Sequence, residues 1–233
     1  MKITALEPQA RHPNRYNLSL DGRFAFGLDA RLVLQHGLAI GAELSEEEAT
    51  RLRGQDEEGR LFDAAVRFLG PRPRSRAEVR TRLLRPRPNQ PPPPLDVVNH
   101  VLDRLAELEL LDDRQFAAFW VENRERFSPR SSRALGAELR QKGVSRETVD
   151  EIAEPERDEE RALAAARTRL RGLTSADYET FRTRLGGFLL RRGFSYGVCA
   201  ATVRSLWEET HGEAADGESD ADDFTSPESG FTE

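Results

Sequence analysis

Two stretches of the chain decide its fold: residues 135–149 read LGAELRQKGVSRETV, and residues 185–199 read LGGFLLRRGFSYGVC. Both place leucines four residues apart, run into basic residues, and then reach a glycine, one apolar residue and a serine. Glycine adopts the left-handed conformation that ends a helix at little cost, and a serine oxygen caps the next helix. The shared unit is therefore helix, tight turn, helix. Its recurrence predicts a tandem helical array, an architecture that presents binding surfaces.

The composition indicates thin helical layers with much solvated surface. Only 37% of the 233 residues are hydrophobic and 33% are charged, and the length suits one large or two small domains. All but two of the 35 basic residues are arginine, the exceptions being Lys2 and Lys142. Arginine forms two-pronged contacts with phosphates and carboxylates, although a GC-rich genome explains the same bias equally well.

The net charge of −6 hides a basic body followed by an acidic tail. From Glu208 onward the chain has ten acidic residues and no Lys or Arg, so the preceding residues carry about +4. We expect the tail to compete electrostatically for the basic surface, so that truncation after Trp207 strengthens partner binding. The simpler alternative is a tail that only keeps the protein in solution.

Cysteine usage and hydropathy predict a cytoplasmic location. The single cysteine, Cys199, excludes an internal disulfide and fits a reducing compartment. No apolar run approaches the roughly 18 residues of a membrane span, and no signal peptide is recognisable. We therefore expect a soluble monomer that does not contact membranes.

A β-hairpin is predicted near the N-terminus, where residues 16–28 alternate around an Asp-Gly pair. A two-residue loop would place Phe24 opposite Ser19. A three-residue loop ending in a bulge at Gly22 would pair Leu18 with Phe24 and put the apolar side chains on one face. The sequence favours the second register.

Helical patterns fill most of the remaining chain. A short helix over residues 29–35 closes at Gly37, and capping boxes begin at Ser45 and Ser75. The run PRPNQPPPP at 86–94 must be an extended loop. The helices group in threes, each a long helix and a helix-turn-helix: 57–70, 75–85 and 95–110; 112–127, 131–142 and 145–153; 156–171, 175–192 and 195–209.

These patterns predict five segments. They are an N-terminal hairpin with short helices (1–55), helical repeat 1 with its Pro-rich loop (56–110), repeat 2 (111–154), repeat 3 (155–209), and a disordered acidic tail (210–233). The predicted fold class is mainly α, with tandem three-helix repeats and a small N-terminal hairpin.

Four stretches resemble the RecX family, regulators of the bacterial recombinase RecA. They are RSRAEVRTRLL (74–84), VLDRLAELELLDDRQFA (101–117), RALGAELRQKGV (133–144) and LLRRGF (189–194). The LDD-x-x-FA segment followed by EL-x-x-KG at this spacing is the most specific of them. The resemblance covers about residues 16–209.

The resemblance implies an elongated, curved array of three-helix repeats that binds the RecA–DNA filament. It also implies suppression of ATP hydrolysis, strand exchange and coprotease activity, with no catalysis by the family member itself. The chain departs from the family where PRPNQPPPP replaces the short basic-Gly-apolar turn of the first repeat. Any partner contact through that turn is therefore in doubt.

Basic side chains are the candidate partner-binding residues. Arginines and lysines can meet DNA phosphates or an acidic protein face, and the alternative is a solvated surface on which arginines cover apolar neighbours. For the final pair, stabilisation of a helix C-terminus is the favoured explanation. The candidates are Arg72, Arg74, Arg76, Arg80 and Arg82; Arg124, Arg126, Arg130, Arg133, Arg140 and Lys142; and Arg191 and Arg192.

The other polar and aromatic motifs predict structural roles. Asp112 precedes a helix as an N-cap. Phe116, Phe119 and Trp120 form a helical stripe that is more typical of a core than of a base-stacking platform. The four histidines lack metal-ligand spacing, and no Gly-rich phosphate loop is present. We therefore expect no catalytic, cofactor-binding or metal-binding residues.

Two functional hypotheses follow. The first is a non-enzymatic inhibitor that binds the RecA nucleoprotein filament, with weak direct contact to single- or double-stranded DNA. The second is a helix-turn-helix regulator that binds DNA without RecA, in which residues 145–148 would begin the recognition helix.

Overall fold

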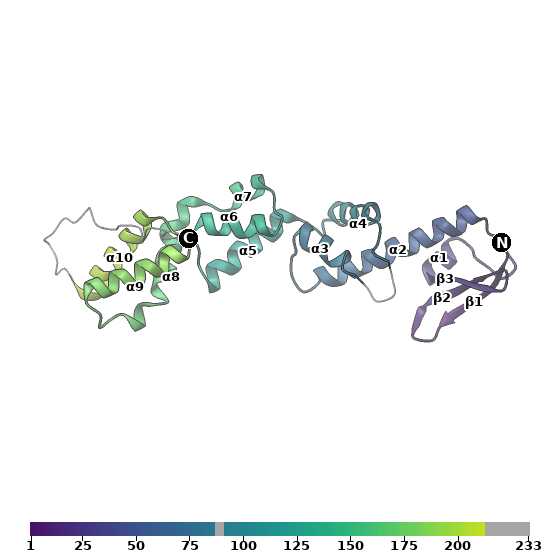
Figure 1. Ribbon diagram of the computed structural model, residues 1–233, viewed down its shortest axis with the longest axis horizontal. Coiled ribbons are helices and arrows are strands. Elements are labelled where there is room, and N and C mark those ends of the chain that lie inside the picture. The colour runs from purple at the N-terminus through teal and green to yellow at the C-terminus, as the bar shows by residue number, and fades with distance from the viewer. Residues whose placement is uncertain (87–90, 213–233) are drawn as a thin grey trace, which may run out of the picture. The chain divides into compact units, whose positions relative to one another are not determined.

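The computed structural model describes residues 1–86 and 91–212, which are mainly helical with a small N-terminal sheet (Figure 1). Two compact units are present: Met1–Glu122 with Gly136–Ile152, and Asn123–Leu135 with the residues from Ala153 onward. The elements are β1 (Ile3–Gln9), β2 (His12–Leu20), β3 (Arg23–Asp29), α1 (Ala30–Gln35), α2 (Glu46–Leu69), α3 (Arg76–Leu83), α4 (Leu95–Glu107), α5 (Asp113–Phe127), α6 (Ser132–Gln141), α7 (Arg146–Ile152), η1 (Pro155–Arg157), α8 (Asp158–Arg167), η2 (Leu170–Gly172), α9 (Tyr178–Arg191) and α10 (Tyr196–His211).

The predicted hairpin is part of a three-stranded antiparallel sheet with the order β1-β2-β3. The favoured register of β2 and β3 is wrong, because Ser19 faces Phe24. Asp21 (φ 49°) and Gly22 (φ 82°) form a two-residue turn with both φ angles positive. Such a turn matches the right-handed twist of the flanking strands, which a longer loop would match less well.

A β-bulge restores the buried face that the register prediction sought. The register shifts between Leu18 and Ser19, so that Leu18 faces Phe26 instead of Ala25. Leu18 and Phe26 are consequently buried, whereas Phe24 is 66% exposed. Both predicted registers assumed regular pairing along the whole hairpin. One extra residue in β3 moves every later side chain of that strand to the other face of the sheet.

Helices α1 and α2 begin where the capping residues predict. The carboxylate of Asp29 accepts a hydrogen bond from the backbone of α1, and Ser45 and Glu48 form the complete predicted capping box. The separate helix predicted from residue 57 is wrong, because α2 is one helix of 24 residues. Gly54 and Gly59 lie within it, and a Cβ atom added at either would meet no other side chain within 4 Å. An isolated glycine is tolerated inside a helix.

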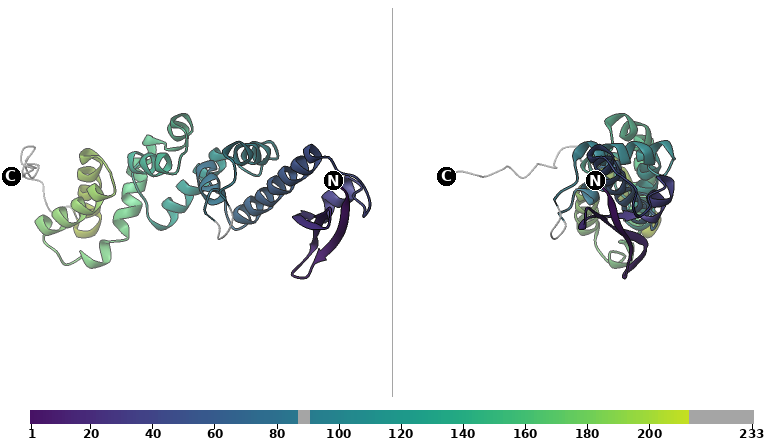
Figure 2. Two further views of the ribbon diagram at one scale, coloured as in Figure 1. Left: turned by 45° about the vertical axis from the view of Figure 1, so that its right-hand side comes forward. Right: turned by 90° about the vertical axis from the view of Figure 1, so that its right-hand side faces the viewer.

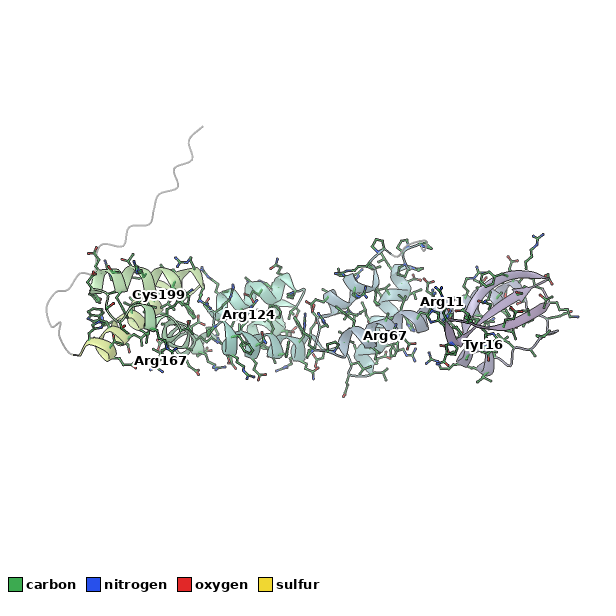
Figure 3. All side chains as sticks on the ribbon, turned by 90° about the horizontal axis from the view of Figure 1, so that it is seen from below. Arg11, Tyr16, Arg67, Arg124, Arg167 and Cys199 are labelled. Atoms are coloured by element: carbon green, nitrogen blue, oxygen red, sulfur yellow. The ribbon has the colours of Figure 1, made fainter. Side chains whose placement is uncertain are left out.

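Three apolar clusters form the cores. The first lies between the N-terminal sheet and the start of α2, and the second is shared by α2, α3 and α4. The third is shared by α8, α9 and α10, which lie side by side (Figure 2). Cys199 of α10 is buried in it (Figure 3), and this burial raises the pKa of the thiol to about 11.

Several predicted segments reach or cross the limits of the described residues. Residues 91–94 of the Pro-rich segment have no regular secondary structure, and residues 87–90 lie outside the description. Helix α10 continues to His211, and the predicted disorder beyond residue 212 also lies outside it. The boundaries between the five predicted segments stay a prediction, although α2 runs through the first of them.

Candidate functional site

The candidate basic side chains divide into those held by the protein and those exposed at its surface. On the segment leading into α3, Arg72 lies 3.4 Å from the Glu78 carboxylate and donates to the Pro73 carbonyl at 2.8 Å. The Arg74 guanidinium stacks on the Phe68 ring at 4.1 Å. Burial lowers the pKa of Arg74, and the charge of Arg72 adds to this effect. Both arginines therefore cover and anchor the protein's own structure.

The arginines of α3 itself differ in the same way. Arg76 forms an ion pair with Asp103, whereas Arg80 and Arg82 are exposed. Arg82 lines an open cavity of about 940 Å³ bounded by α1, α2, α3 and α4. Other arginines and several carboxylates also line this cavity, so it does not favour ligands of one charge.

Lys142, one of the predicted binding residues, makes several contacts within the protein. Its ammonium group lies 3.0 Å from Glu78 and 5.0 Å from the centre of the Trp120 ring. Its carbonyl accepts a hydrogen bond from the Ser75 hydroxyl at 2.7 Å. The predicted capping box at Ser75 is consequently only half formed, because Ser75 accepts from the Glu78 backbone while the Glu78 carboxylate binds the two cations.

The charge of Glu78 is stabilised by these partners. Burial alone would raise the pKa of its carboxyl group, but hydrogen bonds from Lys142 and Arg72, together with their charges, lower the pKa overall. The sequence predicts a cap for Glu78 from its spacing to Ser75. The ion pair with Lys142 gives no local signal, because Lys142 lies 64 residues further along the chain.

The candidates between α5 and α7 are mostly at the surface. Arg126, Arg133 and Arg140 are exposed, whereas Arg124 and Arg130 are partly buried. Figure 3 shows Arg124 on the α5 ribbon. The Arg126 guanidinium lies 5.1 Å from the Phe127 ring of its own helix. The three exposed residues are free to contact a partner.

The two arginines that end α9 have different roles. Arg191 is exposed. Arg192 donates to the Ser128 hydroxyl at 3.1 Å and to the Pro129 carbonyl at 2.8 Å, and it stacks on the Phe188 ring at 4.5 Å. Besides the predicted stabilisation of the helix C-terminus, Arg192 therefore connects α9 to the segment that follows α5.

Sequence reasoning missed two arginines. Arg169 lies over the same Phe188 ring at 5.0 Å, and its location in the basic run RTRLRGL at 167–173 was the available signal. Arg161 is 2% exposed and bonds Glu125 at 2.8 Å and the Ala153 carbonyl at 2.7 Å. A lone arginine among alanines gives no sequence signal of such burial.

The turn glycines lie against the start of a helix in the preceding helical set. Gly143 has φ 83°, and a Cβ atom there would overlap the Cβ of Ala77 in α3. The N-terminus of α3 is also bound from the other side, because the Arg76 backbone N–H donates to the Asp113 carboxylate at 2.7 Å.

The same arrangement recurs one set further along. Gly193 has φ 91°, and a Cβ atom there would lie 2.6 Å from the Ser131 hydroxyl and 2.9 Å from the Ala134 Cβ. The Ser132 backbone N–H donates to the Asp158 carboxylate at 2.7 Å. Turn glycine, small residue and capping carboxylate thus form one junction that is used twice.

Helix starts in these sets follow the predicted caps. The Asp112 carboxylate accepts from the Arg114 backbone at 2.7 Å, and Ser145 and Ser195 accept from Thr148 and Val198. Of the predicted core stripe, Phe116 is buried, whereas Phe119 and Trp120 are partly buried. None of the helices in the described residues is long and apolar enough to span a membrane. No group of three or more His, Cys, Asp or Glu in the same ranges could hold a metal ion.

Family models match three segments of the chain. Residues 1–45 match the "Regulatory protein RecX N-terminal domain", 112–152 match "RecX, second three-helix domain", and 156–203 match "RecX, third three-helix domain". Together these segments make up more than half of the chain.

Curated relatives have the same name, "Regulatory protein RecX". The protein of Clostridium botulinum (strain Eklund 17B) is 27% identical, and the match covers 87% of this chain and 95% of the relative. That of Bacillus subtilis (strain 168) is 28% identical over 88% and 76%. The protein of Halalkalibacterium halodurans is 33% identical over 64% of this chain and 55% of the relative.

Two crystal structures have a similar fold. One of a regulatory protein RecX matches with a TM-score of 0.64 and 24% identity, covering 88% of this chain and 98% of the other. RecX from Lactobacillus salivarius matches with a TM-score of 0.54 and 20% identity, covering 65% and 97%.

Proposed function

Because the chain belongs to the RecX family of regulatory proteins, we propose that it is a non-enzymatic inhibitor of RecA. In this proposal it binds the RecA–DNA filament in the cytoplasm as a monomer and suppresses ATP hydrolysis, strand exchange and coprotease activity. Its role would lie in DNA repair, homologous recombination and the SOS response.

The observation that carries the proposal is a set of exposed arginines on α3, α5, α6 and α9. These residues form no ion pair with any other described residue, so their charge is available to an acidic protein face or to phosphates. They are Arg80, Arg82, Arg126, Arg133, Arg140 and Arg191. Tandem repeats can contact more than one protomer of a filament at once, and such contacts would block the motions that hydrolysis and strand exchange require.

The alternative, a helix-turn-helix protein that reads DNA without RecA, receives less support. Helix α7 has only seven residues, and its first turn is already engaged. The Ser145 hydroxyl caps the helix, and the Arg146 guanidinium lies 3.5 Å from Asp150. This exposed pair holds Arg146 only weakly, so the short length of α7 is the main observation against a base-reading role.

The test is DNA-stimulated ATP turnover by RecA, measured as this protein is titrated in. We expect inhibition at a near-stoichiometric ratio, and its absence contradicts the proposal. The variant Arg80→Glu/Arg82→Glu should inhibit more weakly than the wild type. Arg23→Glu/Arg51→Glu changes the charge equally at two exposed residues outside the candidate set and should inhibit normally.

A further inference from the structure

The open cavity of about 940 Å³ bounded by α1, α2, α3 and α4 lies within the first compact unit. Its volume falls in the range of about 300–1,000 Å³ that is typical of small-molecule sites. Gly59 lines the cavity from the middle of α2, and a Cβ atom added there would meet nothing within 4 Å. A glycine inside a helix costs stability, and one use of it is to let a ligand approach the backbone closely. The cavity is therefore open to a flat group at Gly59.

Most of the charged groups that line the cavity pair with one another. Asp56 is 5% exposed and accepts hydrogen bonds from both amino groups of Arg15, at 3.1 and 2.8 Å. Glu58 lies 3.5 Å from Arg104. The lining as a whole has six arginines and four carboxylates, so some positive charge remains after this pairing.

The remaining positive charge is on Arg67 and Arg82, which form no ion pair with any other described residue. Arg67 is on the last turn of α2 (Figure 3), and Arg82 is on the last turn of α3. The Arg82 guanidinium lies 5.9 Å from the centre of the ring of Phe68, which follows Arg67 in sequence. Two guanidinium groups on the same cavity suit an anionic group with several oxygens.

Asp63 is the most exposed carboxylate that lines the cavity. Its side chain is 44% exposed and lies 3.4 Å from Arg31, whose shorter contact, at 2.9 Å, is with Asp29. Gly59, Asp63 and Arg67 follow one another at intervals of four residues, so they share one face of α2 and span about 12 Å. Along this face the cavity offers open backbone, then a hydrogen-bond acceptor, then a cation.

We propose that this cavity binds a ribonucleoside phosphate. The base lies against Gly59, and the ribose hydroxyl groups donate to Asp63. The phosphates accept hydrogen bonds from Arg67 and Arg82. The groups along α2 thus have the same order as the base, ribose and phosphate of the ligand. The carboxylates of the lining oppose a ligand that is only anionic, but they accept hydrogen bonds from the donors of a nucleoside.

No short sequence motif displays this site, because its phosphate-binding arginines belong to two helices. The inference goes beyond the proposed function and does not depend on it, because ligand binding is measured without RecA.

The experiment is calorimetric titration of the full-length protein with ATP, GTP, the corresponding deoxynucleotides and tripolyphosphate, up to about 1 mM. We expect ATP or GTP to bind, and its deoxy form to bind about tenfold more weakly, because it lacks the 2′-hydroxyl donor. In Asp63→Ala the ribo and deoxy forms should bind equally. The proposal is overturned if neither nucleotide binds, if tripolyphosphate binds as tightly as the nucleotide, or if Asp63→Ala keeps the preference for ribose.

Two glycine variants of α2 provide the matched comparison. Gly59→Leu places a side chain in the cavity and should weaken nucleotide binding by at least about tenfold. Gly54→Leu makes the same change in the same helix at a residue that does not line the cavity, and it should bind as the wild type does. Leucine is a better helix former than glycine, so neither melting temperature should fall. Equal nucleotide affinity of the two variants would contradict the location of the site.

Discussion

Arg161 of α8 illustrates how a single charged residue organises the polypeptide around it. Its side chain is 2% exposed, and it donates to the Glu125 carboxylate and to the carbonyl groups of Ala153 and Glu154. Glu154 has a left-handed backbone (φ 42°), so this carbonyl is presented by an irregular segment. The arginine therefore satisfies groups that no helix can satisfy.

Replacing this residue with an apolar one of similar length should be strongly destabilising. Arg161→Met leaves the carbonyl oxygens of Ala153 and Glu154 without their donor and leaves the Glu125 carboxylate with Arg157 as its remaining partner, so we expect a loss of about 3 kcal/mol in the free energy of unfolding. Arg167→Met is the control, because its ion pair with Glu209 is at the surface, where such pairs contribute less than about 1 kcal/mol. Urea unfolding measures both, and equal losses would contradict the assignment.

At the scale of elements, the turn glycines are required by what they pack against. At Gly193 an alanine would adopt an unfavourable φ of 91° and also collide with Ser131 and Ala134. We expect Gly193→Ala to lower the free energy of unfolding by more than about 2 kcal/mol. Gly186→Ala, in the middle of α9 with open space around it, should instead stabilise by about 0.5 kcal/mol. Thermal unfolding of the two variants should therefore shift in opposite directions.

The first repeat departs from the glycine turn for a related reason. At Gly143 and Gly193 the close approach is to the start of a helix in the preceding helical set. No such set precedes the first repeat, where a sheet and α1 stand instead. The steric requirement for glycine that a preceding helical set imposes is therefore absent in the first repeat, whose sequence has a Pro-rich segment instead.

Glu78 makes the contact between α3 and the end of α6 sensitive to pH. Its pKa is lowered from the ordinary value of 4.5, so its stabilisation is present above that value and is lost as the pH falls through the lower, folded-state pKa. Glu78→Gln should therefore cost about 1.5 kcal/mol at pH 7 and much less at pH 3. Urea unfolding at the two pH values measures this, with Glu147→Gln, an exposed residue of α7, as the control. A cost that does not change with pH would contradict it.

Local signals predicted the elements well, and long-range contacts limited the rest. The caps at Ser45, Asp112 and Ser195 depend on residues within three positions, so the sequence displays them. The bulge between Leu18 and Ser19 and the strand β1 depend on partners across the sheet. Strand β1 also includes Pro8, which weakens its strand pattern. The sequence does not show which candidate basic residues have a partner within the protein. Arg80 is exposed, whereas Lys142 bonds Glu78 of another helical set, and helix prediction does not reveal contacts between sets.

For the whole molecule, stability is distributed among separate cores. The sheet, the α2–α4 set and the α8–α10 set each bury their own apolar cluster. In such an arrangement each part depends mainly on its neighbours in sequence, as in other repeat proteins. Surface charge can consequently differ from one part of the chain to the next without disturbing a common core. The largest change in charge along the sequence is the acidic C-terminal segment.

The acidic tail gives the last prediction. Residues 213–233 contain eight acidic residues and no Lys or Arg, so residues 1–212 have 33 acidic and 35 basic residues. The cut should follow Gly212 and not Trp207, because His211 stacks on Trp207 at 3.6 Å within α10. We expect the truncated protein to bind RecA-coated DNA more tightly at about 0.05 M salt, because the tail no longer competes for the exposed arginines.

Salt and a neutral tail distinguish this competition from a solubilising role. At about 1 M salt the screening length falls to roughly 3 Å, so the advantage of truncation should disappear. A full-length variant with the eight tail acids changed to Asn and Gln keeps the length of the tail and should bind as tightly as the truncated protein. Anisotropy measurements on both variants check this. An affinity equal to that of the wild type at low salt would mean that the tail's carboxylates do not reach the basic surface.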